Sequence, residues 1–201
     1  MRNIPYHPVI LASQSPRRQE LLARITEDFV VCPADVDESL SPDCTPEENV
    51  RQLAQRKARA VFAQAEPGAL VIAADTIVVC DGIILGKPED EADAVRMLRM
   101  LSGRTHQVMT AVCVKTTDAE CAEVSITDVT FRALHDGEAE AYAASGEPLD
   151  KAGAYGIQGA GGLFISGIRG DYYGVMGLPI CLLGEMLRQV CGGTNVETQK
   201  G

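Results

Sequence analysis

The sequence predicts an α/β protein built as one unit around a mixed β-sheet. Short apolar, β-branched runs alternate with segments of helical period along most of the chain, which is the pattern of an α/β fold. Two pairs of these runs are joined by tight turn signals, so part of the sheet is expected to be antiparallel. A chain of 201 residues fits one domain, and it has neither an internal repeat nor an obvious linker.

The first third of the chain is expected to hold two short strands and two helices. A buried strand over 9–12 leads into a helix over 16–25, and a second strand follows over 29–32. Ser15 caps the first helix. Pro16 suits the first helical position because an N–H group there would have no acceptor within the helix. A capping box over 45–48 starts the second helix, which should run to about Gln64 with its apolar residues at helical spacing.

The strongest strand signal is the apolar, β-branched run over 70–80, and the Asp81-Gly82 pair after it signals a hairpin turn into a strand over 83–85. Two longer strands, about 107–115 and 121–131, are expected to pair with each other. Together these strands form the centre of the predicted sheet.

Helices are predicted from Asp90 to Leu101 and over 137–145, followed by a glycine-rich region over 153–170 with short strands inside it. A last helix is expected over 180–191. We therefore expect a single domain over 1–191 and a polar, disordered tail over 192–201.

Composition narrows the function. Apolar content of 46% and charged content of 23% are ordinary for a globular protein. No apolar run approaches the roughly 18 residues that a membrane span needs, and the N-terminus lacks the apolar stretch of a signal peptide, so we expect a cytoplasmic protein without membrane contact. The net charge of −10 argues against stable binding of nucleic acid.

Cysteine and histidine spacing gives no sign of a disulfide framework or a zinc site. The seven cysteines are scattered, form no CxxC pair, and in several cases lie in apolar runs, where a free cysteine behaves as a small buried hydrophobe. The three histidines also lack ligand spacing, and we interpret them as structural or surface residues: His7, His106 and His135.

The segment over 13–18 has the features of an anion site. Arg17 and Arg18 fall in the first helical turn, at the positive end of the helix dipole, where cations are disfavoured unless an anion joins them. With the hydroxyl of Ser13 and the free backbone N–H groups, the two guanidinium groups form the kind of site that binds phosphate. The alternative is that both arginines are solvated on a surface helix.

Carboxylates are the candidates for acid–base or metal chemistry. Asp75, followed by Thr76, lies inside the most apolar run, where a carboxylate is costly unless it is paired or coordinates a metal. Asp37 and Glu38 lie on an acidic loop, and two acids from distant segments suit a hard ion such as Mg²⁺. The alternatives are that Asp75 bonds a neighbouring loop and that the loop acids are solvated.

Three further side chains could contact a nucleotide. Lys57 lies on a helix and Lys87 follows a hairpin arm, and each could also be plain surface charge. The amide of Gln158 has a donor and an acceptor, so it could pair with the imide edge of uracil or thymine, or instead bond the glycine-rich segment over 156–162. That segment matches no P-loop and is a weak phosphate signal.

A set of short motifs resembles the Maf (septum-formation) family, in order and with family-like spacing over about residues 9–190. The motifs are Ser13-Gln14-Ser15-Pro16-Arg17-Arg18, Ala74-Asp75-Thr76, Gly86-Lys87-Pro88, Leu101-Ser102-Gly103-Arg104-Thr105-His106, Gly146-Glu147-Pro148-Leu149-Asp150-Lys151-Ala152-Gly153 and Gly177-Leu178-Pro179. One departure is visible: Gly174 stands where many members carry asparagine, and Met176 replaces a β-branched residue.

The resemblance implies a house-cleaning nucleoside triphosphate pyrophosphatase, which converts a nucleoside triphosphate and water to the monophosphate and pyrophosphate. It implies an elongated α/β fold similar to that of inosine triphosphatases, an active-site cleft, a divalent cation (Mg²⁺ or Mn²⁺) and a homodimer. Within the family the chain looks like the dTTP/UTP pyrophosphatase subgroup, with modified pyrimidine nucleotides as additional substrates. Two alternatives stay open: a 7-methyl-GTP pyrophosphatase, and a nucleotide-binding regulator of septum formation with little hydrolysis.

The resemblance also implies a role for each candidate residue. Asp75 would be the catalytic proton acceptor and would hold the cation with Glu38. Base selection would fall on Arg17, Thr76 and Gln158. The triphosphate would be bound by basic and hydroxyl side chains: Ser13, Arg17, Arg18, Lys57 and Lys87.

Overall fold

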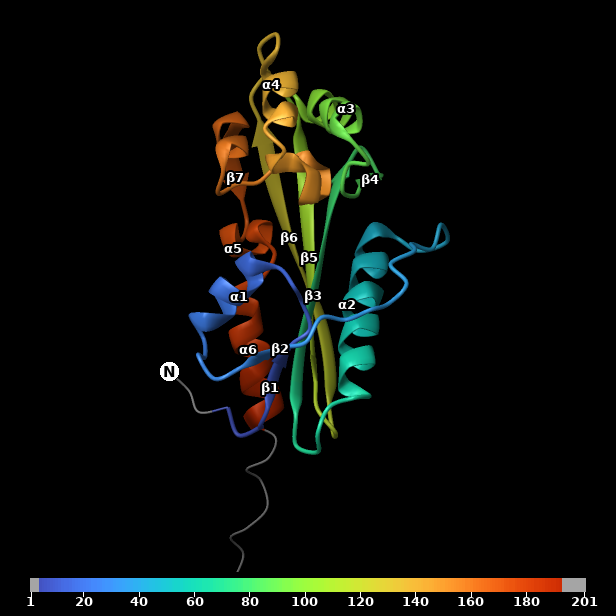
Figure 1. Ribbon diagram of the computed structural model, residues 1–201, viewed down its shortest axis with the longest axis vertical. Helices are drawn as coiled ribbons and strands as arrows, with labels where there is room; N and C mark the ends of the chain where they lie inside the picture. The colour runs from blue at the N-terminus through green and yellow to red at the C-terminus, as the bar shows by residue number, and fades with distance from the viewer. Residues whose placement is uncertain (1–3, 193–201) are drawn as a thin grey trace, which may run out of the picture.

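The fold is that of a computed structural model in which residues 4–192 are described, so the predicted tail lies outside the described residues except for Gly192. Within this range a seven-stranded mixed sheet runs along an elongated molecule (Figure 1). The strand order is β2-β1-β3-β5-β6-β7, and β4 also pairs with β3. The strands are β1 (Val9–Leu11), β2 (Val30–Val31), β3 (Leu70–Cys80), β4 (Ile83–Leu85), β5 (Thr105–Lys115), β6 (Glu120–Phe131) and β7 (Ile165–Arg169).

Strand pairing confirms the mixed sheet and both hairpins. β1 is parallel to β2 and to β3, whereas the other neighbours are antiparallel. Cys80 is paired with Ile83 across the first hairpin, and Lys115 with Glu120 across the second. The long strands β3, β5 and β6 therefore form the axis of the molecule (Figure 1).

Helices cover the sheet in two groups (Figure 1). In the lower half, α1 and α6 lie on one face and α2 on the other; α3 and α4 pack at the upper end. The described residues form three clusters of buried apolar side chains, one at the upper end, one under α1 and α6, and one under α2. The helices are α1 (Pro16–Ala23), α2 (Pro46–Phe62), α3 (Glu91–Leu101), α4 (Glu138–Ala144), α5 (Tyr172–Met176) and α6 (Ile180–Gly192).

One edge of β3 is divided between two partners. β5 runs along the other edge of β3, while β1 pairs only with its beginning, Leu70 to Ile72, and β4 only with its end, Val78 to Cys80. Among the described residues, the edge over 73–77 has no strand partner. Because side chains alternate along a strand, Asp75 and Thr76 point to opposite faces of the sheet at this opening.

The structure differs from the sequence predictions mainly in the glycine-rich region. Instead of several short strands, this region holds short 3₁₀ helices, η2 (Ala152–Ala154) and η3 (Ala160–Phe164), followed by the single strand β7. The helix α5, which includes Gly174 and Met176, was not predicted, because five residues are too few to show a period. The first helix ends at Ala23, two residues earlier than expected.

Other predictions concern absences and are tested only within residues 4–192. No disulfide bond is present there, and Cys80 and Cys113 are buried as expected. His106 is buried with its Nε2 atom 2.8 Å from the Tyr155 hydroxyl, which confirms it as a structural residue. No described helix has the length and apolar character that a membrane span requires.

Candidate active site

The opening in the edge of β3 leads into a cleft of about 1010 Å³. Side chains from the start of α1, from α2, from β3 and from the segments after β2, β4 and η2 line it. The residues to which the family resemblance assigns a role all lie on its wall: Ser13, Arg17, Arg18, Glu38, Lys57, Asp75, Thr76, Lys87 and Gln158. Asp37, the other candidate acid, does not line the cleft, and its carboxylate accepts hydrogen bonds from the backbone N–H and the hydroxyl of Ser39.

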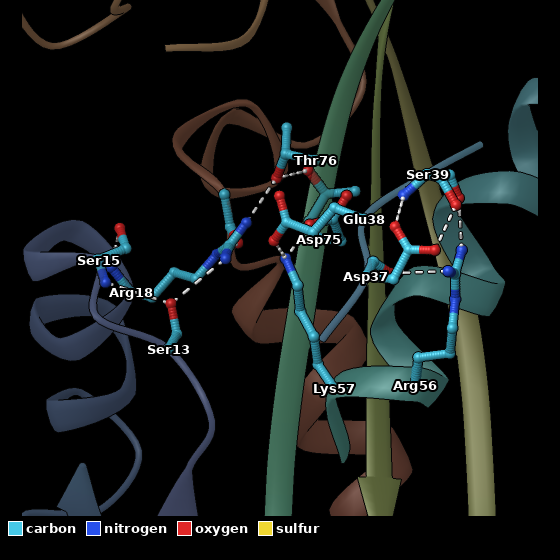
Figure 2. A network of polar contacts seen from close by, with 12 residues as sticks. Ser13, Ser15, Arg18, Asp37, Glu38, Ser39, Arg56, Lys57, Asp75 and Thr76 are labelled. Carbon is cyan, nitrogen blue, oxygen red and sulfur yellow. Dashed lines mark hydrogen bonds and ion pairs between the residues drawn. The ribbon is translucent and has the colours of Figure 1, made fainter. Parts of the chain in front are cut away.

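The α2 face of the opening holds a three-membered charge cluster (Figure 2). The Lys57 ammonium lies 2.5 Å from Oδ1 of Asp75 and 2.6 Å from Oε1 of Glu38. Lys57 and Asp75 are mostly buried, whereas the Glu38 side chain is 60% exposed. The hydrogen bond from Lys57 lowers the pKa of Glu38.

The loop that carries Glu38 is fixed by a second residue of α2. Arg56 donates from Nη1 to the carbonyl oxygen of Asp37 at 2.7 Å and from Nη2 to that of Ser39 at 2.9 Å, so it holds the backbone on both sides of Glu38 (Figure 2). The helix that carries Arg56 begins with a capping box, in which Thr45 and Glu48 form reciprocal hydrogen bonds.

On the other face of β3, Arg18 joins three parts of the cleft wall (Figure 2). Its Nε donates to the carbonyl oxygen of Gly177 at 2.8 Å, its Nη2 to Oγ1 of Thr76 at 3.1 Å and its Nη1 to Oγ of Ser13 at 3.3 Å. Burial lowers the pKa of Arg18, and the nearby Asp75 carboxylate opposes that shift.

Thr110, which the sequence did not single out, supports the site from the buried side of Thr76. It is paired with Thr76 in the sheet register, and their hydroxyl oxygens lie 2.9 Å apart. Thr110 also donates to the carbonyl oxygen of Gly174 at 2.7 Å. A hydroxyl inside an otherwise apolar strand, directly across from Thr76, is the signal that would have identified it.

Three of the nominated side chains reach into the cleft with few contacts. Arg17 makes one long ion pair, Nη1 to Oδ2 of Asp150 at 3.7 Å. Lys87 and Gln158 are exposed, and neither side chain makes a hydrogen bond to another residue of the described range. These groups are therefore available to a ligand.

A metal ion in the cleft would depend on the carboxylates of Glu38 and Asp75. No group of three or more His, Cys, Asp and Glu side chains within residues 4–192 is arranged to hold a metal ion. Glu38 and Asp75 nevertheless converge on one point, the Lys57 ammonium. Because Mg²⁺ is commonly held by one or two carboxylates together with water and substrate phosphates, this donor set fits such an ion with a phosphate ligand present.

The fold is that of an α/β protein with a cleft in which arginine and lysine side chains lie around two carboxylates. Such a cleft is a site for a small phosphorylated ligand. The model of the family described as "Maf-like protein" matches residues 8–190. The chain belongs to this family.

The alignments with curated relatives span nearly the whole length of each relative. The chain is 49% identical over 178 residues to a protein of Thermococcus gammatolerans (89% of this chain, 94% of the relative). It is 52% identical over 181 residues to one of Moorella thermoacetica (89% and 93%), and 48% identical over 181 residues to one of Bacillus velezensis (90% and 95%). Each of these relatives is named dTTP/UTP pyrophosphatase.

Solved structures give weaker likenesses. The Ham1 protein of Staphylococcus aureus matches with a TM-score of 0.46 and 20% identity, over 61% of this chain and 71% of that one. A nucleoside-triphosphatase / dITP/XTP pyrophosphatase of Mycobacterium abscessus matches with a TM-score of 0.43 and 14% identity, over 92% and 95%. Both TM-scores lie below 0.5, so the similarity to inosine triphosphatase folds stays a prediction.

Proposed function

We propose that this protein is a nucleoside triphosphate pyrophosphatase that hydrolyses dTTP and UTP to the monophosphate and pyrophosphate. The observation that carries the proposal is the cleft at the open edge of β3, where Asp75 and cationic side chains from separate segments line the same wall. The name shared by relatives that match about nine-tenths of the chain supports the same activity.

Binding of the triphosphate is assigned to the cations and to the start of α1. Within residues 4–192, Arg17 makes one long ion pair and the Lys87 side chain makes no hydrogen bond or ion pair, so their charge is available to phosphate oxygens. A guanidinium carries five N–H donors, and Arg18 uses three of its groups in protein hydrogen bonds, which leaves donors for a ligand. The Ser13 hydroxyl lies beside Arg18.

The reaction asks for in-line attack of water on the α-phosphorus. The water oxygen forms the new bond, the bond from the α-phosphorus to the bridging oxygen breaks, and pyrophosphate leaves with the electron pair. Asp75 accepts the proton of the water, and the lysine and arginine side chains of the cleft stabilise the charge that builds on the leaving oxygens.

A divalent cation, Mg²⁺ or Mn²⁺, would be held by Glu38 and Asp75. When bound, the ion would lower the pKa of the attacking water and would neutralise part of the negative charge on the phosphates. The same two carboxylates are the partners of Lys57, so the ammonium and the cation share one set of oxygen ligands.

Selection of the base is assigned to Gln158, Thr76 and Arg17. The free amide of Gln158 has the donor and the acceptor that the imide edge of uracil or thymine needs. Cytosine and adenine present their donor and acceptor in the opposite order, so they would not match an amide held in the orientation that fits the imide edge. A substituent at C5 avoids the imide edge, so modified pyrimidine nucleotides are proposed as additional substrates.

Three further properties belong to the proposal. We infer a homodimer, a cytoplasmic location and no stable binding of nucleic acid. These inferences rest on the family and on the acidic charge of the chain.

The test is release of pyrophosphate from a panel of triphosphates with Mg²⁺ or Mn²⁺: UTP, dTTP, CTP, ATP, GTP and 7-methyl-GTP. We expect kcat/KM for UTP and dTTP to exceed that for the other nucleotides by at least about tenfold, because unmade polar contacts discriminate strongly. Equal rates would contradict the role of Gln158. Fastest turnover of 7-methyl-GTP would establish that alternative, and binding without turnover would indicate a regulator.

A further inference from the structure

The side chain of Gln158 depends on the backbone around it for its direction. Gln158 is exposed, and its amide makes no hydrogen bond to any residue that the structure describes. It lies in the short connection between η2 and η3, which has no strand or α-helix to fix it. Some other part of the molecule must therefore hold this connection in place.

Tyr142 and Glu147 provide that support on both sides of Gln158. The Tyr142 hydroxyl accepts a hydrogen bond from the Gly156 backbone N–H at 3.1 Å and donates to Oε1 of Glu147 at 2.8 Å. The other carboxylate oxygen of Glu147, Oε2, accepts from the Ala160 backbone N–H at 3.1 Å. The two anchored amides come two residues before and two residues after Gln158.

The glycines of this segment are explained by the same two side chains. A Cβ atom on Gly159 would lie 2.0 Å from Oε1 of Glu147, and one on Gly161 would lie 2.7 Å from the Tyr142 hydroxyl. Only glycine lets the backbone approach so closely. By itself the glycine-rich sequence is only weak evidence for a phosphate site. Its glycines are instead spaced so that the backbone can pack directly against the Glu147 carboxylate and the Tyr142 hydroxyl.

The supporting pair is itself firmly held. Tyr142 is 5% exposed and packs edge-to-face on Phe164, with the ring centroids 5.3 Å apart. Its burial raises its pKa, so the hydroxyl keeps the proton that it donates to Glu147. The backbone N–H of Glu147 donates to the Ser145 hydroxyl, and the Lys151 ammonium donates to the Glu147 carbonyl oxygen.

We propose that Tyr142 and Glu147 are positioning residues for pyrimidine selection, because they fix the backbone that aims Gln158 at the base. The inference rests on the proposed function, which assigns Gln158 to the imide edge. Neither residue needs to touch the base to act in this way. Their contribution should therefore appear in substrate discrimination, through KM for the correct nucleotide.

The experiment measures kcat and KM for UTP and CTP in Tyr142→Phe, Glu147→Ala and Glu147→Gln. We expect Tyr142→Phe and Glu147→Ala each to lower the UTP/CTP ratio of kcat/KM about five- to tenfold, the effect of losing about one hydrogen bond. The loss should lie in KM for UTP. Glu147→Gln keeps one acceptor oxygen and should fall between wild type and Glu147→Ala.

A matched control is Glu140→Gln, the same substitution at a carboxylate of α4, the helix of Tyr142, that pairs with Arg99 instead of the loop. It should leave the ratio unchanged. In a Gln158→Ala background, adding Tyr142→Phe should change the ratio no further, because both changes act through one group.

The outcomes separate the inference from the proposed function. If Gln158→Ala collapses the UTP/CTP ratio but Tyr142→Phe and Glu147→Ala leave it as in wild type, the positioning role is wrong and the role of Gln158 stands. If Gln158→Ala leaves the ratio unchanged, both are wrong. Should Tyr142→Phe fail to fold, the half-buried Glu147 carries the test alone.

Discussion

Lys57 holds together two carboxylates that would otherwise repel each other at the mouth of the cleft. Its ammonium contacts both Glu38 and Asp75, and its hydrogen bond is the largest cause of the lowered pKa of Glu38. Lys57 therefore joins three different segments of the chain, and Glu38 depends on it for its lowered pKa.

Replacement of Lys57 should be visible in the titration of Glu38. In Lys57→Gln the charged partner is lost, so the pKa of Glu38 should rise toward its ordinary value. The measurement is a pH titration of the Glu38 side-chain carboxyl by NMR. The control is Lys115→Gln, which removes an ammonium that contacts Glu120 instead. An unchanged Glu38 titration in Lys57→Gln would show that Lys57 does not control this acid.

His106 predicts a pH dependence of stability. Burial lowers the pKa of His106 to about 4, from an ordinary value near 6.5. Between these values the unfolded chain binds the proton that the folded protein excludes, so the free energy of unfolding falls as pH falls from about 6.5 to about 4. At about 1.4 kcal/mol for each pH unit, the loss amounts to about 3 kcal/mol by pH 4.

Urea unfolding at several pH values in wild type and His106→Gln measures this contribution. Other groups titrate in the same range, so the quantity of interest is the difference between the two proteins. The slope should be flatter in His106→Gln between pH 6.5 and 4. Parallel curves would mean that His106 is protonated in the folded state as easily as in the unfolded chain.

The residues that the sequence identified by physical argument are those whose local surroundings are unusual. Asp75 stands out as a carboxylate in an apolar strand, and Arg17 and Arg18 as cations at a helix start. By contrast, Thr110 and Tyr142 act through hydrogen bonds to residues 34 and 14 positions away, respectively, so their roles become visible only once those partners are in place.

At the scale of elements, α2 is the one that serves the site most directly. It supplies Lys57 to the charge cluster and Arg56 to the acidic loop, and its first turn is closed by the Thr45–Glu48 capping box. Both side chains lie several residues beyond the capped start of α2.

Removal of the cap should destabilise the protein without changing the chemistry of the cleft. Thr45→Ala deletes the hydroxyl that accepts from the Glu48 backbone N–H, and we expect it to lower the free energy of unfolding by about 1 kcal/mol. Denaturant unfolding measures the effect. Thr117→Ala, at an exposed threonine in the turn after β5, is the matched control. Equal effects of the two substitutions would mean that the cap contributes nothing.

Elements with strong periodicity or clear turns were predicted closely, whereas those shaped by contacts were not. β3 and β4 match their predicted bounds because an apolar run and an Asp-Gly turn define them locally. The 3₁₀ helix η2 depends on a close approach instead: Gly153 has φ of +69°, and a Cβ there would lie 2.8 Å from Cγ2 of Val78. Such a constraint exists only once β3 is in place.

At the scale of the whole molecule, the cleft exists because β1 and β4 share one edge of β3 without meeting. The first belongs to the lower half of the sheet and the second to the upper half, each with its own helices and core. Neither the order of these strands nor the opening between them follows from local sequence signals, because both depend on pairing between distant segments. The resemblance to a family, carried by short motifs, brought together residues that spacing alone could not.

The most direct test of the proposed reaction is a single comparison of wild type with Asp75→Asn. The substitution keeps the shape of the side chain but removes the proton acceptor, so pyrophosphate release from UTP should fall about 10²- to 10⁴-fold. Equilibrium binding of the nucleotide should stay within a few fold of wild type, because the arginine and lysine side chains are intact. Full turnover in Asp75→Asn would contradict the assignment of this cleft edge as the catalytic centre.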